Sequence, residues 1–437
     1  MWIFAAVTSA VFGVCQYFGL ADALSPWINH TQPGTAFANL RQRNQFATLT
    51  SIGLLALMRH LASYSHQQRI PVWAWVSAVC LALGNAASSS RTGLLEWAFI
   101  LAAMCWWYLS AYRKLAVFVA QVMLVYLLAA IALPHLLAEI SGRSSEALLS
   151  RLNEIPSCNS RMVLWFNVLT LIAEKPWLGW GWGELAYAHY MTLYPEERFC
   201  DILDNAHNLP LHLAVELGLP FSAAVCAVLS WLVWRARPWR ETDPSRQMVW
   251  AVLAVILLHS MLEYPLWYGP FQMAFGLCVW MLWPVLREAA GSCPYAHVGA
   301  VVRLVLASAL LATVAYAAWD YHCISQLYLA PQARDPAYRD NTLDKVHGSW
   351  FFRNQVLFAE LTTTALKRSN AQWTFDTATA LLHYSPEPRV IEKVIESAVM
   401  LGRDDEALLH LVRYRAAFPD EYTKWRHANG LTGGPAD

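Results

Sequence analysis

The chain has 437 residues, of which 57% are hydrophobic and only 14% are charged. Its 31 basic and 31 acidic side chains cancel, which leaves no basic surface for nucleic acid, and the apolar composition excludes a soluble enzyme and a disordered chain. Nearly half of the charged residues lie in residues 320–437. The composition therefore predicts an all-α, polytopic membrane domain over residues 1–319, followed by a soluble helical domain over residues 320–437.

About nine segments are apolar and long enough to cross a membrane, which takes about 20 helical residues. The first lacks a basic segment before it and a small-residue cleavage site after it, so we interpret it as a retained helix. The second is short and needs its polar neighbours to complete the span. The predicted spans are residues 2–20, 46–59, 71–88, 92–110, 115–136, 208–234, 248–267, 270–286 and 299–319.

Short loops rich in Lys and Arg stay in the cytoplasm. One alternating set of loops carries Arg59, Arg113 and Arg235, and we predict that this set is cytoplasmic. The opposite set includes the long loop 137–207, and this set and the C-terminal domain then face the periplasm of a Gram-negative bacterium. The sequence thus predicts a multi-pass protein of the bacterial inner membrane.

The nine cysteines show no Cys/His pattern with the spacing of a metal site, so we expect no bound metal. Cys158 and Cys200 share the long outer loop, where an oxidising compartment would allow a disulfide. The sequence leaves open whether these two cysteines are bonded.

A polar segment at residues 39–45 precedes the second span on the predicted outer face. Its guanidinium and amide groups either anchor that span in the membrane interface or hold an anionic or sugar-bearing ligand. The candidate ligand-binding residues in this segment are Arg41, Arg43, Asn44 and Gln45.

A second outer segment, residues 88–93, places Arg91 at the start of a predicted helix among small hydroxyl residues. The N–H groups at a helix N-terminus and a guanidinium both favour phosphate. The simpler alternatives are a Ser/Thr cap and a pair between Arg91 and Glu96, which lies one turn into the helix.

Arg161 opens a stretch with helical periodicity, residues 161–173, in the long outer loop. A run rich in Gly and Trp follows over residues 174–183. Its flat side chains suit either stacking on sugar rings or the headgroup zone of the membrane, and composition does not separate these two uses.

His207 lies at the predicted outer mouth of the sixth span, and Glu263 and Tyr264 lie at an outer helix end after the seventh. A histidine in such a place titrates near neutral pH and can act as a general base. The alternative is a packed or hydrogen-bonded structural histidine.

Four of these segments carry a resemblance to a known family: Ser90-Arg91-Thr92, Arg161, residues 176–181 and His207-Asn208. They resemble the O-antigen ligase and polymerase superfamily of bacterial membrane glycosyltransferases, which use undecaprenyl-diphosphate-linked sugars. The ligase pattern has His-Asn, nine residues, Gly, two residues, and then Gly, Thr or Tyr. Gly218 fits this pattern and Phe221 does not, which points away from the lipopolysaccharide ligase branch.

Two further segments point to one branch. Residues 40–47 and 259–267 are similar to segments of PglL-type protein O-oligosaccharyltransferases, a family that also carries a periplasmic domain after its last span. Members of that family usually have additional N-terminal helices, so this chain is expected to be a short or truncated member.

The resemblance implies transfer of an oligosaccharide from undecaprenyl diphosphate to Ser or Thr hydroxyls of periplasmic proteins such as pilin, at the periplasmic face and without metal or cofactor. His207 would take the proton of the acceptor hydroxyl, while Arg91 and Arg161 would bind the diphosphate and stabilise its growing charge. The residues expected to orient sugar or acceptor are Arg41, Arg43, Asn44, Gln45, Glu263 and Tyr264.

Two other functions are competing hypotheses. An O-antigen ligase or polymerase would use the same lipid-linked donor with a sugar acceptor. A membrane transporter would need charged residues deep in several facing spans. The polar residues instead gather at the outer helix ends, with Glu96 and Glu216 as the main exceptions.

The C-terminal domain shows helical patterns over residues 374–383, 389–401 and 404–418. Residues 402–408, followed by Pro419, resemble one tetratricopeptide-like helix pair, and a generic helical bundle is the alternative. Such a domain would dock the acceptor protein or stabilise the membrane part.

Overall fold

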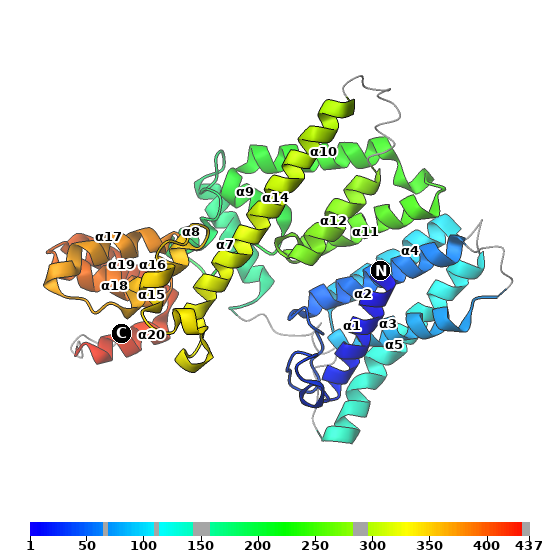
Figure 1. The fold of residues 1–437 in the computed structure, drawn as a ribbon, viewed down its shortest axis with the longest axis horizontal. Helices are drawn as coiled ribbons and strands as arrows, with labels where there is room; N and C mark the ends of the chain where they lie inside the picture. Colours follow the sequence, from blue (N-terminus) through cyan, green and yellow to red (C-terminus); the bar gives the residue numbers. More distant parts are fainter. Residues whose placement is uncertain (64–68, 109–112, 143–157, 283–295, 431–437) are drawn as a thin grey trace. The chain divides into compact units, whose positions relative to one another are not determined.

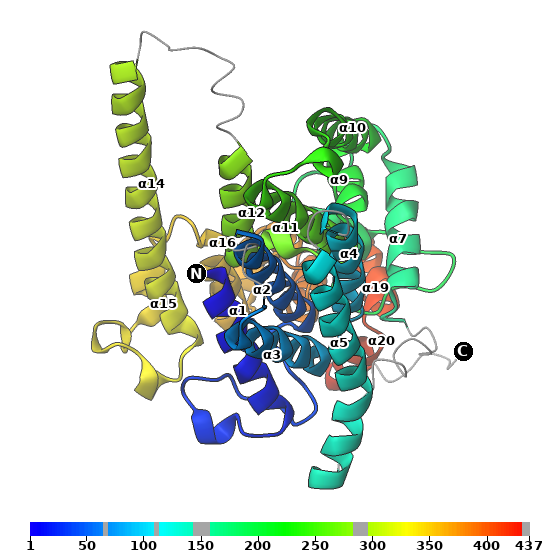
Figure 2. The ribbon, with the colours of Figure 1, turned by 90° about the vertical axis from the view of Figure 1, so that its right-hand side faces the viewer.

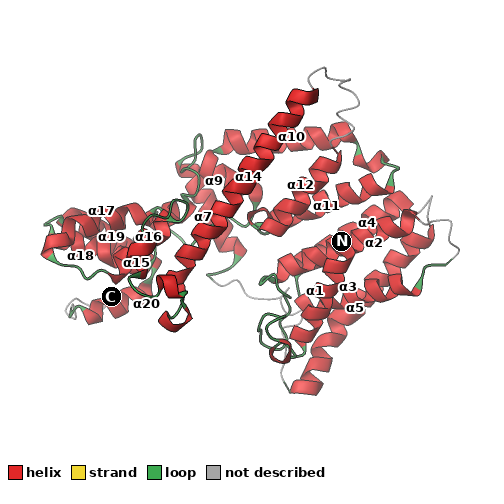
Figure 3. Ribbon diagram, viewed as in Figure 1, coloured by secondary structure: helices red, strands yellow, loops and turns green. Residues whose placement is uncertain are grey.

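The computed structural model describes five stretches of the chain, and every regular element in them is a helix (Figure 3). This confirms the prediction of an all-α fold. The described residues are 1–63, 69–108, 113–142, 158–282 and 296–430.

Two compact units make up the chain, and each takes residues from separate parts of the sequence. The first contains residues 1–156, 207–210 and 224–290, and the second contains residues 157–206, 211–223 and 291–437.

The first unit is a helical bundle built around one central helix, α2. Its main helices are α1 (Trp2–Tyr17), α2 (Arg43–Ser63), α3 (Val72–Ser88), α4 (Arg91–Tyr108), α5 (Arg113–Ser141), α11 (Pro244–Ser260) and α12 (Gly269–Leu282). Helix α2 packs against α1, α3, α4 and α11 (Figure 2). Its residues from Phe46 to Met58 are almost all buried. A helix enclosed in this way is apolar around most of its circumference rather than on one face.

Small residues let α1, α2 and α3 approach one another closely. A Cβ atom added at Gly13 would lie 2.4 Å from the Phe46 ring, and one added at Gly53 would lie 2.3 Å from the Cβ of Ala6. Such close approach through small residues is characteristic of helix packing in membranes.

Among the described residues, four helical segments are long and apolar enough to cross a membrane, and α1, α3 and α12 are shorter apolar helices. The chain is a multi-pass membrane protein by this criterion. The predicted span 46–59 was too short to cross a membrane without its polar neighbours. Helix α2 includes such neighbours, because it extends beyond this span at both ends. The four segments are Arg43–Ser63, Arg113–Ser141, Leu219–Arg240 and Val301–Tyr328.

The predicted sixth span, residues 208–234, was wrong in its start, because these residues form two helices and the segment long and apolar enough to cross a membrane is Leu219–Arg240. Helix α9 (Leu209–Leu217) ends before Gly218, and α10 (Leu219–Ala236) begins directly after it. Gly218 has a φ of +89°, and a Cβ atom there would lie 2.1 Å from the carbonyl oxygen of Trp177. Only glycine fits this position, so a tertiary contact that hydropathy does not register sets the break.

The second unit contains most of the C-terminal helices, and α17, α18 and α19 pack around a shared apolar core that includes Phe375, Ile391 and Val394 (Figure 1). The predicted helices over residues 374–383, 389–401 and 404–418 are confirmed. Its helices are α7 (Arg161–Glu174), α8 (Leu185–Met191), α14 (Ala296–Ser325), α15 (Thr342–Val346), α16 (Arg353–Thr363), α17 (Ala371–Leu382), α18 (Pro388–Met400), α19 (Asp404–Ala417) and α20 (Pro419–Ala428).

Cys158 and Cys200 form a disulfide, with their Cα atoms 5.4 Å apart, which answers the question that the sequence left open. Buried Asn167 on α7 holds the same stretch of chain: its Nδ2 donates to the carbonyl oxygen of Glu197 at 3.0 Å, and its Oδ1 accepts from the N–H of Phe199 at 2.8 Å. The disulfide and this amide together fasten the loop after α8 to the region of α7.

The Gly/Trp loop at residues 175–183 is fixed through its backbone. The N–H of Leu219, at the start of α10, donates to the carbonyl oxygen of Pro176 at 2.8 Å. Trp177 and Trp182 nevertheless remain 76% and 63% exposed. The loop therefore presents large flat side chains beside the first turn of an apolar helix.

Candidate active site

His207 and Glu263 meet in the first unit. The Nδ1 atom of His207 lies 2.7 Å from Glu263 Oε2, and the two side chains are 26% and 11% exposed. A carboxylate this close to Nδ1 favours a proton on that atom, which would leave the Nε2 lone pair available to a substrate. The arrangement is that of a histidine base oriented by a carboxylate.

The backbone around His207 is held in an unusual conformation. His207 has a φ of +50°, in the left-handed region, directly before α9. Asn208 Nδ2 donates to the carbonyl oxygen of Met261 at 3.0 Å, which fastens this segment to the turn after α11. The Tyr264 ring meets the His207 ring edge-on at 4.9 Å and stacks on Tyr268 at 5.8 Å. Tyr264 therefore lies directly beside the candidate base.

Asn44 joins Glu263 to the segment around Ser90. Its Nδ2 donates to Glu263 Oε1 at 3.0 Å, and its Oδ1 accepts from Ser90 Oγ at 2.6 Å. Ser90 also caps α4, because its Oγ accepts from the N–H of Gly93 at 3.0 Å. The two oxygens of Glu263 thus hold Asn44 and His207 in place. We call Asn44, Ser90, His207, Glu263 and Tyr264 the His207 cluster.

Arg91 is the first residue of α4 and is exposed, directly after Ser90. The alternative of a pair with Glu96 does not hold, because the Glu96 oxygens are met by the hydroxyls of Thr48 and Ser51 at 2.5 and 2.7 Å. Side chains five residues apart lie on different faces of a helix, whereas a spacing of three or four would have brought them together.

The rest of the 39–45 segment is divided between surface and interior. Arg41 is exposed, with a φ of +60° just before α2, and Arg43 is half-buried as the first residue of that helix. Gln45 is 3% exposed, and its N–H donates to Gln42 Oε1 at 2.7 Å. Of the four predicted residues in this segment, the hydrogen bonds above place Asn44 in the His207 cluster.

Arg161 belongs to the second unit. It is the first residue of α7, after Ser160, whose Oγ accepts from the N–H of Val163 at 3.3 Å. The start of a helix is suited to an anion, and a role of Arg161 at the diphosphate stays a proposal.

Two histidines of the second unit, His189 and His410, are more deeply buried than His207. His410 Nδ1 lies 3.0 Å from the hydroxyl oxygen of Tyr190, and burial, aided by nearby Arg413, lowers the pKa of His410 to about 4. Burial, together with Arg198, lowers the pKa of His189 to about 3. Both rings are therefore neutral near pH 7 and serve packing rather than proton transfer.

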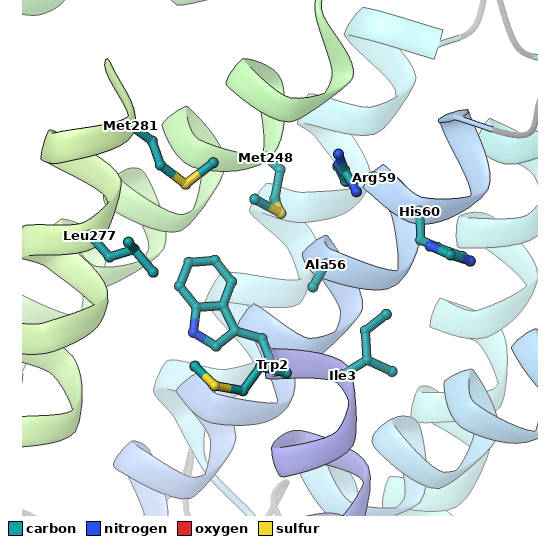
Figure 4. A pocket seen from close by; sticks show the side chains of 9 residues that line it. Trp2, Ile3, Ala56, Arg59, His60, Met248, Leu277 and Met281 are labelled. Carbon is teal, nitrogen blue, oxygen red and sulfur yellow. The ribbon is translucent and has the colours of Figure 1, made fainter. Parts of the chain in front are cut away.

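A hollow of about 410 Å³ opens in the first unit between α1, α2, α11 and α12 (Figure 4). Its lining is mostly apolar and includes Trp2, Met248 and Met281, with Arg59 and His60 from the C-terminal end of α2. Asn44 is at the opposite end of the same helix, so the hollow is separate from the His207 cluster.

Sequence reasoning did not identify four buried polar residues beneath the His207 cluster as a group. They are Thr48, Ser51, Glu96 and His259. Two signals were present in the sequence: an acidic residue inside a predicted span, and hydroxyl residues three apart on one helix face.

The chain matches three families. Residues 36–58 match the family described as protein glycosylation ligase, residues 76–226 match O-antigen ligase, and residues 247–430 match virulence factor membrane-bound polymerase, C-terminal. Each matched segment contributes to the His207 cluster: Asn44 comes from the first, Ser90 and His207 from the second, and Glu263 and Tyr264 from the third.

Two curated relatives come from Acinetobacter baylyi. The general O-oligosaccharyltransferase is 21% identical over 285 residues, which cover 63% of this chain and 48% of the relative. The ComP-specific O-oligosaccharyltransferase is 24% identical over 251 residues, which cover 56% of this chain and 43% of the relative. The chain thus spans about half the length of the curated relatives it matches. No solved structure matches it.

Proposed function

We propose, from the confirmed resemblance of this chain to PglL-type protein O-oligosaccharyltransferases within the O-antigen ligase superfamily, that it is a glycosyltransferase. It transfers an oligosaccharide from undecaprenyl diphosphate to Ser or Thr hydroxyls of periplasmic proteins such as pilin. The observation that carries this proposal is the 2.7 Å contact between His207 Nδ1 and Glu263 Oε2, which joins two separately matched segments into one acid–base pair.

The pair suits the proton transfer that such a reaction needs. The acceptor oxygen forms a bond to the anomeric carbon of the first sugar, the bond from that carbon to the diphosphate oxygen breaks, and undecaprenyl diphosphate leaves. His207 Nε2 takes the hydroxyl proton, and Glu263 stabilises the resulting imidazolium ion. Tyr264, beside the imidazole ring, would orient the acceptor or the sugar.

The departing diphosphate needs positive charge near it. Arg91 follows Ser90, which hydrogen-bonds to Asn44 in the His207 cluster, and it occupies the N-terminus of α4, so guanidinium and backbone N–H groups face an anion together. Arg161, at the start of α7, would supply a second guanidinium. We expect these two groups, rather than a divalent cation, to neutralise the growing charge. Arg41, Arg43 and Gln45 would contact the sugar.

The same proposal includes an arrangement in the cell. Residues 1–319 would form a domain of about nine spans in the bacterial inner membrane, with the His207 cluster facing the periplasm. Residues 320–437 would form a periplasmic domain that holds the acceptor protein and contains a tetratricopeptide-like helix pair. Flipped lipid-linked glycans and secreted acceptors would then reach the same face of the membrane.

An O-antigen ligase or polymerase is the second candidate, because residues 76–226 match the O-antigen ligase family. It would use the same donor and the same base with a sugar acceptor. Loss of the lipopolysaccharide ladder in a knockout strain, with glycoproteins intact, would favour this alternative.

The proposed function is tested by transfer of a lipid-linked glycan to a pilin-like acceptor in cells. His207→Ala should abolish transfer while the protein stays in the membrane at its normal level. His30→Ala, at an exposed histidine of the loop between α1 and α2, is the matched control and should transfer normally. Unchanged glycosylation in the His207→Ala strain would rule out His207 as the base.

A further inference from the structure

A second polar cluster lies one helical turn deeper than Asn44 and is fully enclosed. Thr48 and Ser51 on α2, Glu96 on α4 and His259 on α11 are each 0% exposed. Thr48 Oγ1 lies 2.5 Å from Glu96 Oε1 and 2.8 Å from His259 Nδ1, and Ser51 Oγ donates to Glu96 Oε2 at 2.7 Å. Polar contacts therefore tie three helices together inside an apolar bundle.

Such a cluster is costly to build. A carboxyl group buried among helices loses its hydration, and only good hydrogen bonds offset that loss. Both oxygens of Glu96 are met by hydroxyls of α2. Well-packed apolar side chains would hold the same helices without this cost, so the polar cluster indicates a purpose beyond packing.

One connection runs from this cluster to the His207 cluster through Asn44. Thr48 Oγ1 lies 2.9 Å from the backbone carbonyl oxygen of Asn44, which accepts its proton. The side chain of Asn44 donates in turn to Glu263 Oε1 at 3.0 Å. The Thr48 hydroxyl also donates to Glu96 Oε1 at 2.5 Å, so its single proton is shared between that oxygen and the Asn44 carbonyl, and the same Oγ1 lies 2.8 Å from His259 Nδ1. The Thr48 hydroxyl is thus the point where all three contacts meet.

A second connection runs through the last turn of α11. The carbonyl oxygen of His259 accepts from the N–H of Glu263 at 2.8 Å and from that of Leu262 at 2.9 Å. The contact of the His259 ring with Thr48 holds that carbonyl in place. Both connections therefore end at Glu263, one at its side chain and one at its backbone.

Building on the function proposed above, we propose that Thr48, Glu96 and His259 are positioning residues for the catalytic pair. They hold Asn44 and the end of α11 so that the Glu263 carboxylate meets His207 Nδ1 in the geometry that proton transfer needs. None of the three touches the substrate. Their contribution is made through Glu263, and it affects the rate of the chemical step rather than donor binding.

The test compares three variants of the full chain purified in lipid nanodiscs, with a lipid-linked oligosaccharide and an acceptor protein. Thr48→Val removes the hydroxyl at nearly constant volume, and Thr48→Ser restores it. Thr50→Val is the matched control: Thr50 is also 0% exposed on α2, but its hydroxyl donates to the carbonyl oxygen of Ala47 and accepts from Asn85 Nδ2, away from Glu96 and His259.

Misplacement of a reacting group by about 1 Å can cost about 100-fold in rate, so we expect Thr48→Val to lower kcat about 10- to 100-fold, with the KM for donor changed less than about twofold. Thr48→Ser should recover most of the kcat. Thr50→Val should keep the kcat of the unaltered protein, although its melting temperature falls about as much as that of Thr48→Val.

The outcomes separate this proposal from the proposed function. If His207→Ala is inactive but Thr48→Val keeps its full kcat, the positioning role is wrong and the function stands; if His207→Ala still transfers glycan, the function itself is wrong. Equal loss of kcat in Thr50→Val, or no recovery in Thr48→Ser, would show that the cluster only packs the helices and does not position Glu263. Should Thr48→Val fail to accumulate, Glu96→Gln is judged by the same kcat and KM.

Discussion

His207 and His410 each have a polar partner close to Nδ1, but the two partners are of different kinds. Nδ1 of His207 faces a carboxylate oxygen of Glu263 at 2.7 Å, whereas Nδ1 of His410 faces the hydroxyl of Tyr190 at 3.0 Å. A nearby carboxylate favours the imidazolium ion, whereas burial, which lowers the pKa of His410 to about 4, favours the neutral ring. Partner and burial, rather than residue type, thus separate the histidine proposed as the base from one that is buried as a neutral ring.

The largest expected effect comes from changing the partner of His207. Glu263→Gln retains the size of the side chain but allows an N–H to face Nδ1, which favours the wrong tautomer, and we expect transfer to fall about 1,000-fold. Glycan transfer by purified protein measures this. Tyr190→Phe, which removes the corresponding partner of His410, is the control and should transfer normally. Similar losses of glycan transfer in Glu263→Gln and Tyr190→Phe would contradict a catalytic difference between His207 and His410.

A smaller effect is expected at the diphosphate. Arg91→Ala should lower transfer about 100-fold, because one charged donor to the developing anion is lost. Arg91→Lys should fall between that variant and the unaltered protein, since an ammonium group has the charge but not the fork geometry. Arg59→Lys, at the other end of α2, should have no effect. Full activity in Arg91→Lys would contradict the bidentate contact.

The smallest effect concerns stability at His410. Its pKa is lowered from 6.5 to about 4 in the folded chain. Between these values the unfolded chain binds a proton that the folded chain does not, so the free energy of unfolding falls as pH drops from about 6.5 to about 4 and levels off below. The loss between pH 7 and pH 5 should be about 2 kcal/mol.

His410→Gln should flatten this dependence, which melting temperatures at pH 7 and pH 5 would show, while transfer at pH 7 stays normal. The dependence should not vanish, because His189 has a pKa lowered to about 3 and contributes with the same sign. An unchanged pH dependence in His410→Gln would show that His410 is not buried as a neutral ring.

Much of this molecule was predictable from local pattern. Apolar periodicity correctly indicated the all-α fold and the C-terminal helices, and residue chemistry singled out His207, Glu263 and Tyr264. The pairing of Asn44 with Glu263 was not predictable, because 219 residues separate them and only the packing of α2 beside α11 brings them together.

The incorrect predictions have the same origin. The break at Gly218 depends on the approach of the Trp177 backbone, which no local signal encodes. The alternative pairing of Arg91 with Glu96 failed as well, because the hydroxyl partners of Glu96 lie on a different helix, α2. Tertiary contacts, rather than weak propensities, set each of these features.

The most direct test of the His207–Glu263 pair is a double-mutant cycle on glycan transfer by the purified chain. We predict that Glu263→Gln lowers kcat/KM strongly in the unaltered protein but causes no further loss in the His207→Ala background, because the carboxylate acts only through the imidazole ring. Additive losses from the two substitutions would show that His207 and Glu263 act independently and would contradict the proposed base.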